Sequence, residues 1–320
     1  ELFEIALAVW EKRAVDDKLE GCRLIDKCCN CSSGILTRIW LQMLSYEETT
    51  DIPTKYKMLF EKILNENRKD KDQVICILVG QYAFLFRKDA KWCAEHLLPF
   101  LKSVEKIEFK AAWEGIVWFS RQLYQELADE LTETYLYAVE RIAEMPKQVR
   151  EGFVNIYTVL MVYAVENPIL EFIPKLFQVA EEEDRKEFIS TIYNCLKNME
   201  KHQKEQLWDN WLKAYWENRL RNIPVSLDEY EKTEMLEWIF EMDDLYPEAV
   251  DIIISGTHIK DIDGLFWYSM KEKEIGKKYP DDTAKLLAFL LCDETNIGYS
   301  GSEIVDIANT IKCSDINNQR

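Results

Sequence analysis

Apolar residues recur along the whole chain with a period of about 3.6, the repeat of an α-helix that buries one face. Each periodic stretch covers about 10 to 18 residues and ends near Pro, Asn, Asp or Ser, which favour helix ends and short polar links. No convincing strand ladder is visible. The pattern predicts helices over 2–13, 35–44, 55–65, 73–87, 90–102, 109–123, 127–143, 148–165, 170–181, 185–198, 204–221, 227–241, 247–254, 262–271, 281–292 and 302–311.

The segment LWDNWLKAYWENRL, at 207–220, carries Trp208, Trp211, Trp216 and Tyr215 within fourteen residues. On a helix, Trp211 and Tyr215 share one face, whereas Trp208 and Trp216 lie off that face. A tryptophan stripe at helical spacing is core far more often than a ligand site. We therefore expect a helix that is buried between neighbours on more than one side.

Two other interpretations of this helix remain open. Trp208, Trp216, Asn218 and Arg219 could form an interaction surface along a groove. Alternatively, Arg219 could hold a buried carboxylate, such as that of Glu217 on a neighbouring turn.

Weak internal similarity accompanies the helical pattern. A shift of 75 residues aligns 97–101 with 172–176, and a shift of 33 aligns Tyr246 and Pro247 with Tyr279 and Pro280. Both intervals suit helical hairpins of about 35 residues, although shared amphipathicity alone could produce such matches. The period is too irregular for tetratricopeptide or ankyrin repeats.

The predicted fold is all-α, an irregular HEAT-like α-solenoid of stacked antiparallel helical hairpins. We expect residues 1–110 to form an N-terminal segment that is continuous with a tryptophan-rich C-terminal domain at 111–320. Only 10 Gly and 8 Pro occur in 320 residues, which argues against a sandwich, a barrel or a Gly-rich nucleotide fold.

The balance of charge narrows the range of partners. Asp and Glu number 58 against 40 Lys and Arg, a net charge of −18, and no long basic block offsets it. Nucleic-acid affinity depends largely on Lys and Arg, so a nucleic-acid partner is disfavoured. A basic or weakly charged protein partner fits better.

The longest apolar run, at 74–86, is interrupted by Gln81 and is shorter than the roughly 20 residues that a membrane helix needs. It predicts a buried core helix, and no membrane partner is expected. No secretion signal is visible at Glu1, where the chain opens within an apolar period without Met. We expect a cytoplasmic protein of which this chain is one piece.

Four of the nine cysteines, Cys22, Cys28, Cys29 and Cys31, lie within ten residues. Their spacing, C-x5-C-C-x-C, lacks the second ligand pair that a structural zinc site needs. Cys22, Cys28 and Cys31 are therefore only weak metal candidates, redox sensing is an alternative, and an ordinary helix end and loop is favoured. The odd number of cysteines, several in apolar runs, predicts reduced thiols that act as small hydrophobes.

No motif of a known active site is present. The three histidines, His96, His202 and His258, do not form H-E-x-x-H, and the phosphate-loop, dinucleotide and nucleophile-elbow motifs are missing. The sequence predicts no catalytic residue, no cofactor and no metal. A small enzyme with a composite site would require a polar pocket of converging carboxylates or thiols.

Three segments carry a family resemblance: AWEGIVW at 112–118, the tryptophan-rich run at 207–239, and LYPEAVDIII at 245–254. They resemble the C-terminal helical domain of unknown function of large prokaryotic sirtuin-like proteins, most closely from about residue 112 to residue 291. In those proteins an N-terminal sirtuin-like domain precedes a long helical region. Several members of the wider class are anti-phage defence proteins that destroy NAD.

The resemblance implies a role rather than a reaction, because the Gly-rich loop and the catalytic His and Asn of a sirtuin have no counterparts here. It implies a non-enzymatic scaffold or sensor that recognises a phage or partner protein, or that holds its own N-terminal effector domain inactive or oligomeric. Self-association is another interaction that the resemblance implies for this chain. The alternative is a general HEAT-like adaptor unrelated to defence.

The buried-helix interpretation makes Trp211 a test of packing. We expect Trp211→Ala to lower the free energy of unfolding by about 3 to 5 kcal/mol, as for other buried aromatic residues. Denaturant unfolding measures the change. Loss of partner binding at unchanged stability would instead support the ligand-site interpretation.

Overall fold

A computed structural model describes residues 2–13, 21–120, 124–259, 261–291 and 296–318, with side chains through residue 311. Within these ranges the protein is helical, and a single isolated bridge joins Asp261 and Asn296. The all-α class is therefore confirmed. The chain forms two compact units, Glu1–Leu160 and Met161–Arg320.

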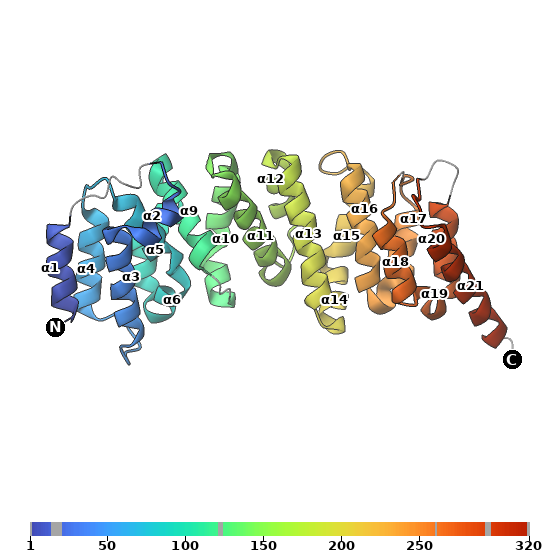
Figure 1. Ribbon diagram of the computed structural model, residues 1–320, viewed down its shortest axis with the longest axis horizontal. Helices are drawn as coiled ribbons and strands as arrows, with labels where there is room; N and C mark the ends of the chain where they lie inside the picture. Colours follow the sequence, from blue (N-terminus) through green and yellow to red (C-terminus); the bar gives the residue numbers. More distant parts are fainter. Residues whose placement is uncertain (1, 14–20, 121–123, 260, 292–295, 319–320) are drawn as a thin grey trace. The chain divides into compact units, whose positions relative to one another are not determined.

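Figure 1 shows the helices of the first unit and labels most of them. They are α1 (Leu2–Lys12), α2 (Leu24–Asn30), α3 (Ser32–Ser45), α4 (Thr54–Asn65), α5 (Lys71–Gly80), α6 (Tyr82–Lys88), α7 (Ala90–His96), α8 (Leu98–Leu101), α9 (Lys106–Phe119), α10 (Gln125–Val139), the 3-10 turn η2 (Ile142–Glu144) and α11 (Lys147–Ala164), which continues into the second unit. The expected division after residue 110 falls inside α9.

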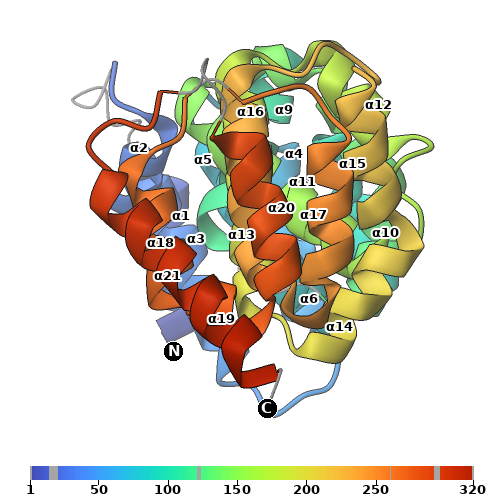
Figure 2. The same ribbon diagram turned by 90° about the vertical axis from the view of Figure 1, so that its right-hand side faces the viewer.

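The second unit continues with α12 (Phe172–Val179), α13 (Glu182–Asn198), α14 (Lys201–Leu207), the π-helical turn η3 (Trp208–Leu212), α15 (Lys213–Leu220), α16 (Glu229–Trp238), the 3-10 turns η4 (Ile239–Glu241) and η5 (Asp243–Leu245), α17 (Tyr246–Ile254), α18 (Gly264–Glu272), α19 (Ile275–Lys278), α20 (Pro280–Leu290) and α21 (Gly301–Asn318). In this unit α21 lies against α18, α19 and α20 (Figure 2). None of the described helices combines the length and the apolar character that a bilayer crossing requires.

The helix at the centre of the first unit is α5, in which every residue from Gln73 to Gly80 is buried. This confirms the buried helix expected from the apolar run, but the helix is interrupted at Gln81, whose amide bonds back to Leu78. The predicted helix over 90–102 is likewise divided, at Leu97. Pro99, near the start of α8, has no amide hydrogen to continue the preceding helix.

The tryptophan-rich segment is a continuous helical stretch formed by α14, η3 and α15. Trp208, Trp211 and Trp216 are all buried, which confirms the packing interpretation. The π-helical turn over 208–212 widens the helix locally and shifts the rotation of the residues that follow. This shift changes the face assignment that a regular α-helical period predicts.

Helix starts follow the expected chemistry, with one correction. The proline pair, Pro247 and Pro280, occupies the first turns of α17 and α20 as predicted. Ser226 and Glu229 have the spacing of a capping box, which predicts that Ser226 caps α16. That prediction is wrong, because Asp228 is the cap and its carboxylate accepts a 2.8 Å hydrogen bond from the amide of Glu231. The Ser226 carbonyl instead accepts a bond from Arg219.

The acidic residues 181–184 lie at the N-terminus of α13. They do not form a solvated link between helices. The Glu181 and Asp184 side chains form a capping box at the N-terminus of α13. The Glu181 side chain accepts a hydrogen bond from the Asp184 amide, and the Asp184 side chain accepts one from the Glu181 amide. The HEAT-like arrangement of the hairpins stays a prediction.

Two glycines permit the close approach of α5 and α9. A Cβ on Gly115 would lie 2.0 Å from the carbonyl oxygen of Cys76, and one on Gly80 would lie 2.7 Å from the carbonyl oxygen of Gly115. Both obstacles are backbone atoms, so no side-chain rotation relieves the clash. The two helices can pack at this distance only with glycine at the crossing.

We therefore expect Gly115→Ala to force α5 and α9 apart. Overpacking costs about 1 to 3 kcal/mol or more, which exceeds the gain of up to about 1 kcal/mol that alanine brings to a helix interior. Urea unfolding measures the loss. The matched control is Gly301→Ala, at the start of α21, where an added Cβ meets nothing within 4 Å. Equal stability of the two variants would contradict the close-packing argument.

Candidate functional site

The centre of the tryptophan-rich segment is a fully buried ion pair between Arg219 of α15 and Glu231 of α16. Two guanidinium nitrogens donate to the two carboxylate oxygens: Nε donates to Oε1 at 2.6 Å, and Nη2 donates to Oε2 at 2.7 Å. This bidentate geometry is the strongest form of the Arg–carboxylate interaction. Of the alternatives that the sequence left open for Arg219, the structure contains an interaction with a buried carboxylate, but the partner is Glu231 rather than Glu217.

Arg219 also organises the connection that follows α15. Nη1 donates to the carbonyl oxygens of Ile223 and Val225 at 2.9 and 2.6 Å, and Nη2 reaches that of Ser226 at 3.3 Å. Loop carbonyls that are removed from water need donors, and this side chain supplies them. The hydrogen-bonding capacity of Arg219 is therefore used inside the protein.

Tyr215 completes this cluster, since its hydroxyl donates to Oε1 of Glu231 at 2.8 Å. Burial and then the charge of Glu231 raise the pKa of Tyr215 well above its usual value. Burial acts to lower the pKa of Arg219, but the hydrogen bond and the charge of Glu231 outweigh it, so the net shift is upward. Arg219 stays cationic and Tyr215 stays neutral at physiological pH, which makes the cluster structural.

The four residues considered as an interaction surface take different positions. Trp208, Trp216 and Arg219 are fully buried, while Asn218 is half-buried. The two indole rings meet edge to face with their centroids 5.4 Å apart, and Trp208 Nε1 donates to Glu248 at 2.8 Å. Direct contact between a partner and the three buried side chains would require this packing to open.

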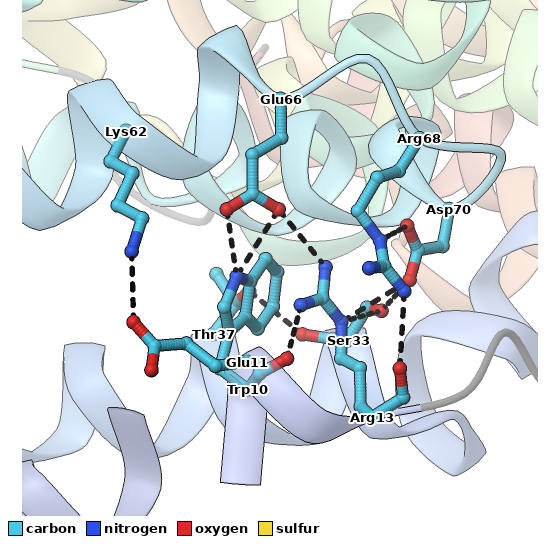
Figure 3. Close-up of polar contacts among 9 residues, drawn as sticks. All are labelled: Trp10, Glu11, Arg13, Ser33, Thr37, Lys62, Glu66, Arg68 and Asp70. Carbon is cyan, nitrogen blue, oxygen red and sulfur yellow. Dashed lines mark hydrogen bonds and ion pairs between the residues drawn. The ribbon is translucent and has the colours of Figure 1, made fainter. Parts of the chain in front are cut away.

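The first unit contains a second buried arginine, Arg13, that the sequence analysis did not single out. Its Nε lies 3.1 Å from Ser33 Oγ and 3.3 Å from a carboxylate oxygen of Asp70, and Nη1 donates to the Trp10 carbonyl at 2.7 Å. The guanidinium stacks 3.0 Å from the centroid of the Trp10 ring. These contacts join the end of α1 to α3 and to the start of α5 (Figure 3).

Charges around Asp70 are balanced within the same cluster. Burial acts to raise the pKa of Asp70, but the Ser33 hydrogen bond and the charges of Arg13 and Arg68 outweigh it and leave the pKa below its usual value. Arg68 donates in turn to the carbonyl of Arg13 at 3.3 Å. Up to 57 residues separate the members of this cluster, and no local sequence motif indicates it.

The cysteine-rich stretch does not gather its thiols. Cys28 and Cys31 are buried, whereas Cys22 and Cys29 are exposed. In the described part of the chain, no three His, Cys, Asp or Glu side chains converge in a way that would hold a metal ion. The Cys28 thiol lies 3.7 Å from the carbonyl oxygen of Gln73, in the interior.

Cys76 is the neighbour of Cys28 in this interior. Its hydrogen bond with Cys28, followed by burial, raises the pKa of the Cys76 thiol well above its usual value. A thiol that resists ionisation is a poor nucleophile and a poor metal ligand. The positions of these two cysteines fit the expected role as small hydrophobes.

A groove lined mainly by acidic side chains opens in the second unit, with a volume of about 490 Å³. Its carboxylates come from Glu229, Glu234, Glu237, Asp261 and Asp263. Burial raises the pKa of Glu234 and of Glu237, and neighbouring carboxylates raise that of Glu237 further. This is the converging-carboxylate pocket that a composite enzyme site would require, although no His, Cys or Lys lines it among the residues that the structure describes.

A larger groove, of about 980 Å³, lies in the first unit between α3 and the α5–α6 pair. We name it the basic groove, because Arg38, Arg87 and Lys88 are its charged lining residues and, within the described ranges, no Asp or Glu lines it. Ile39 and Phe84 supply apolar surface beside these cations. Sequence analysis missed this groove because its walls come from separate helices.

A family model described as "Domain of unknown function (DUF4020)" matches the C-terminal part of the chain. The match covers residues 169–319, for which the name DUF4020 domain is used below. No curated protein and no solved structure matches the chain. A domain of unknown function agrees with the resemblance drawn from the sequence.

The DUF4020 domain contains the Arg219–Glu231 pair, the buried tryptophans and the acidic groove. The basic groove and the Arg13 cluster lie before residue 169, outside the match. Within the DUF4020 domain, the buried polar cluster at Arg219 stabilises the loop between α15 and α16. The exposed and half-buried carboxylates named above line its open groove.

We expect Glu231→Gln to destabilise the DUF4020 domain by about 3 to 5 kcal/mol, because it leaves the buried Arg219 charge uncompensated. Thermal and urea unfolding of the full chain measure the loss. The control is Glu229→Gln, which removes an exposed partner of Lys232 and should cost less than about 1 kcal/mol. Similar losses in both variants would show that the buried pair does not hold the domain together.

Proposed function

We propose that this chain is a non-enzymatic helical scaffold or sensor region of a larger cytoplasmic defence effector. It recognises a phage or partner protein, or it holds an N-terminal effector domain inactive or oligomeric. The observation that carries the proposal is the basic groove, an open groove of about 980 Å³ with both apolar and cationic side chains. Grooves of this composition suit the recognition of protein segments.

The buried polar groups support the same assignment. Arg13 and Arg219 form the closed clusters described above, and their hydrogen bonds go to protein carbonyls and carboxylates. Groups engaged in this way stabilise loops and helix ends rather than bind a substrate. The net charge of −18 favours a protein partner over nucleic acid, and no membrane partner is proposed.

The link to defence rests on the sequence resemblance to sirtuin-associated helical domains, which the DUF4020 match supports at the level of a domain of unknown function. A general HEAT-like adaptor is the alternative. A sirtuin-like or nuclease domain encoded just before Glu1 would favour the defence role. An unrelated coding sequence at that position would favour the adaptor.

A second candidate function, acid–base catalysis, rests on the acidic groove. Burial raises the pKa of Glu234 and of Glu237, and general acid–base chemistry uses carboxyl groups whose pKa is raised. Substrate turnover by the chain that is lost in Glu237→Gln would favour this candidate over the scaffold.

We expect the purified chain to leave NAD intact. Chromatography of NAD and nicotinamide over time measures turnover, with a known NAD-cleaving enzyme as the positive control. Cells that carry the complete gene should form fewer phage plaques than cells that lack it. NAD cleavage by this chain alone would contradict the non-enzymatic assignment, and unchanged plaque formation would contradict the defence role.

A further inference from the structure

Two helical faces form the walls of the basic groove. One wall is the face of α3 that carries Ile35, Arg38, Ile39, Gln42 and Ser45, at the spacing i, i+3, i+4, i+7 and i+10. The opposite face of α3 is buried in the unit, through residues such as Trp40 and Leu44. The outward face is therefore a continuous stripe about 15 Å long, at 1.5 Å per residue.

The second wall has a matching stripe on α5 and α6. Ile77, Gly80, Gln81, Phe84 and Lys88 line the groove at the spacing i, i+3, i+4, i+7 and i+11. The space beside Gly80 is filled by α9, since an added Cβ would lie 2.7 Å from the Gly115 carbonyl oxygen. The chain turns at Gln81 between α5 and α6, and the end of α9 also lines the groove through Phe119 and Ser120.

The two walls run in the same direction. Lys88 Nζ, at the end of α6, donates a 2.7 Å hydrogen bond to the carbonyl of Thr49, which follows the end of α3. Arg87 and Lys88 therefore lie near the end of the groove that Ser45 marks. Arg38 lies seven residues before Ser45, about two helical turns or 10 Å from that end.

The cations of the groove are not neutralised by carboxylates in its lining. Arg38 forms no ion pair with any described residue, and the Arg87 guanidinium stacks 4.5 Å from the centroid of the Tyr124 ring. Glu47, a carboxylate beyond the end of α3, is already paired with Lys55 at 2.6 Å. The hydrogen bond from Lys55, and to a smaller extent the charge of Lys88, lowers the pKa of Glu47, so Lys88 is partly balanced. In a chain of net charge −18, Arg38 and Arg87 are the groove cations that form no ion pair with a described carboxylate.

We propose that the basic groove binds an acidic amphipathic helix of a protein partner. The apolar stripe of that helix packs on Ile39 and Phe84. Two carboxylates of the helix, about seven residues apart, form ion pairs with the groove. One carboxylate pairs with Arg38, and the other pairs with Arg87 and Lys88 about two helical turns away. The inference rests on the proposed role in protein recognition and names the chemistry of the partner.

A helix fits this groove because its own repeat matches the walls. Apolar anchors at i, i+3, i+4 and i+7 are the recurring solution for a helix in a hydrophobic groove. Carboxylates at i and i+7 lie on nearly the same face two turns apart, the separation of the two cationic levels. Opposite charges in this arrangement set orientation and speed association.

The test uses the full chain and a labelled synthetic peptide of about 14 residues, rich in alanine, with leucine at i+3 and i+4 and glutamate at i and i+7. Fluorescence anisotropy measures its binding. A second peptide with glutamine in place of both glutamates is the charge control. We expect the glutamate peptide to bind more tightly, and to weaken when salt rises from about 0.15 to 1 M, where the Debye length falls from about 8 to 3 Å.

The chain offers matched variants. Arg38→Glu combined with Arg87→Glu should weaken glutamate-peptide binding by about 10-fold or more, because attraction becomes repulsion at both levels. The control is Lys69→Glu, an exposed cation that does not line the groove, which should bind as the unaltered chain does. Circular dichroism checks folding, and Arg38→Gln with Arg87→Gln replaces the double reversal if that variant unfolds.

Several outcomes would overturn the inference: no binding of the glutamate peptide, equal binding of the glutamine peptide, or an equal loss in Lys69→Glu. Dodecanoate serves as a small anionic amphiphile, and groove-dependent binding of dodecanoate without peptide binding would assign the groove to small molecules. Self-association that Arg38→Glu abolishes, again without peptide binding, would assign it to a second copy.

The outcomes also separate this inference from the proposed function. If a phage protein or the effector domain binds equally well to the chain with both arginines reversed, protein recognition stands and the basic groove is not its site. If the chain cleaves NAD, the non-enzymatic assignment fails whatever the peptide result.

Discussion

Backbone carbonyl groups at helix ends and in the loops between helices have no partner within a helix and need other hydrogen-bond donors. Two buried arginines supply such donors here. Arg219 serves three carbonyls of the connection between α15 and α16, and Arg13 serves the last turn of α1. Each guanidinium also meets a buried carboxylate, Glu231 or Asp70. Without these donors, the helix ends would leave polar groups unsatisfied in the interior.

This constraint also shapes what the protein can do. A guanidinium that is committed to loop carbonyls and a carboxylate cannot serve a partner without disrupting the fold. Binding therefore depends on side chains that the packing leaves at the surface. The basic groove and the acidic groove are two such places, one in each unit, with opposite charge.

Local signals predicted much of the helical content but misplaced details that depend on distant residues. Ser226 and Glu229 have the spacing of a capping box, yet Asp228 is the cap because α16 begins at Glu229. Glu217 is near Arg219 in sequence, yet Glu231 is the partner because the first turn of α16 meets the last turn of α15. The π-helical turn at 208–212 could not be read from a regular period.

The sequence by itself determined the all-α class, the burial of the tryptophans and the positions of Pro247 and Pro280 at helix starts, because these depend on periodicity and on backbone chemistry within a few residues. Only the tertiary structure decided which charges pair and where surfaces remain open. The Arg13 cluster spans 57 residues, and the basic groove combines faces of separate helices. Such arrangements arise from packing between distant segments, and no local pattern encodes that packing in readable form.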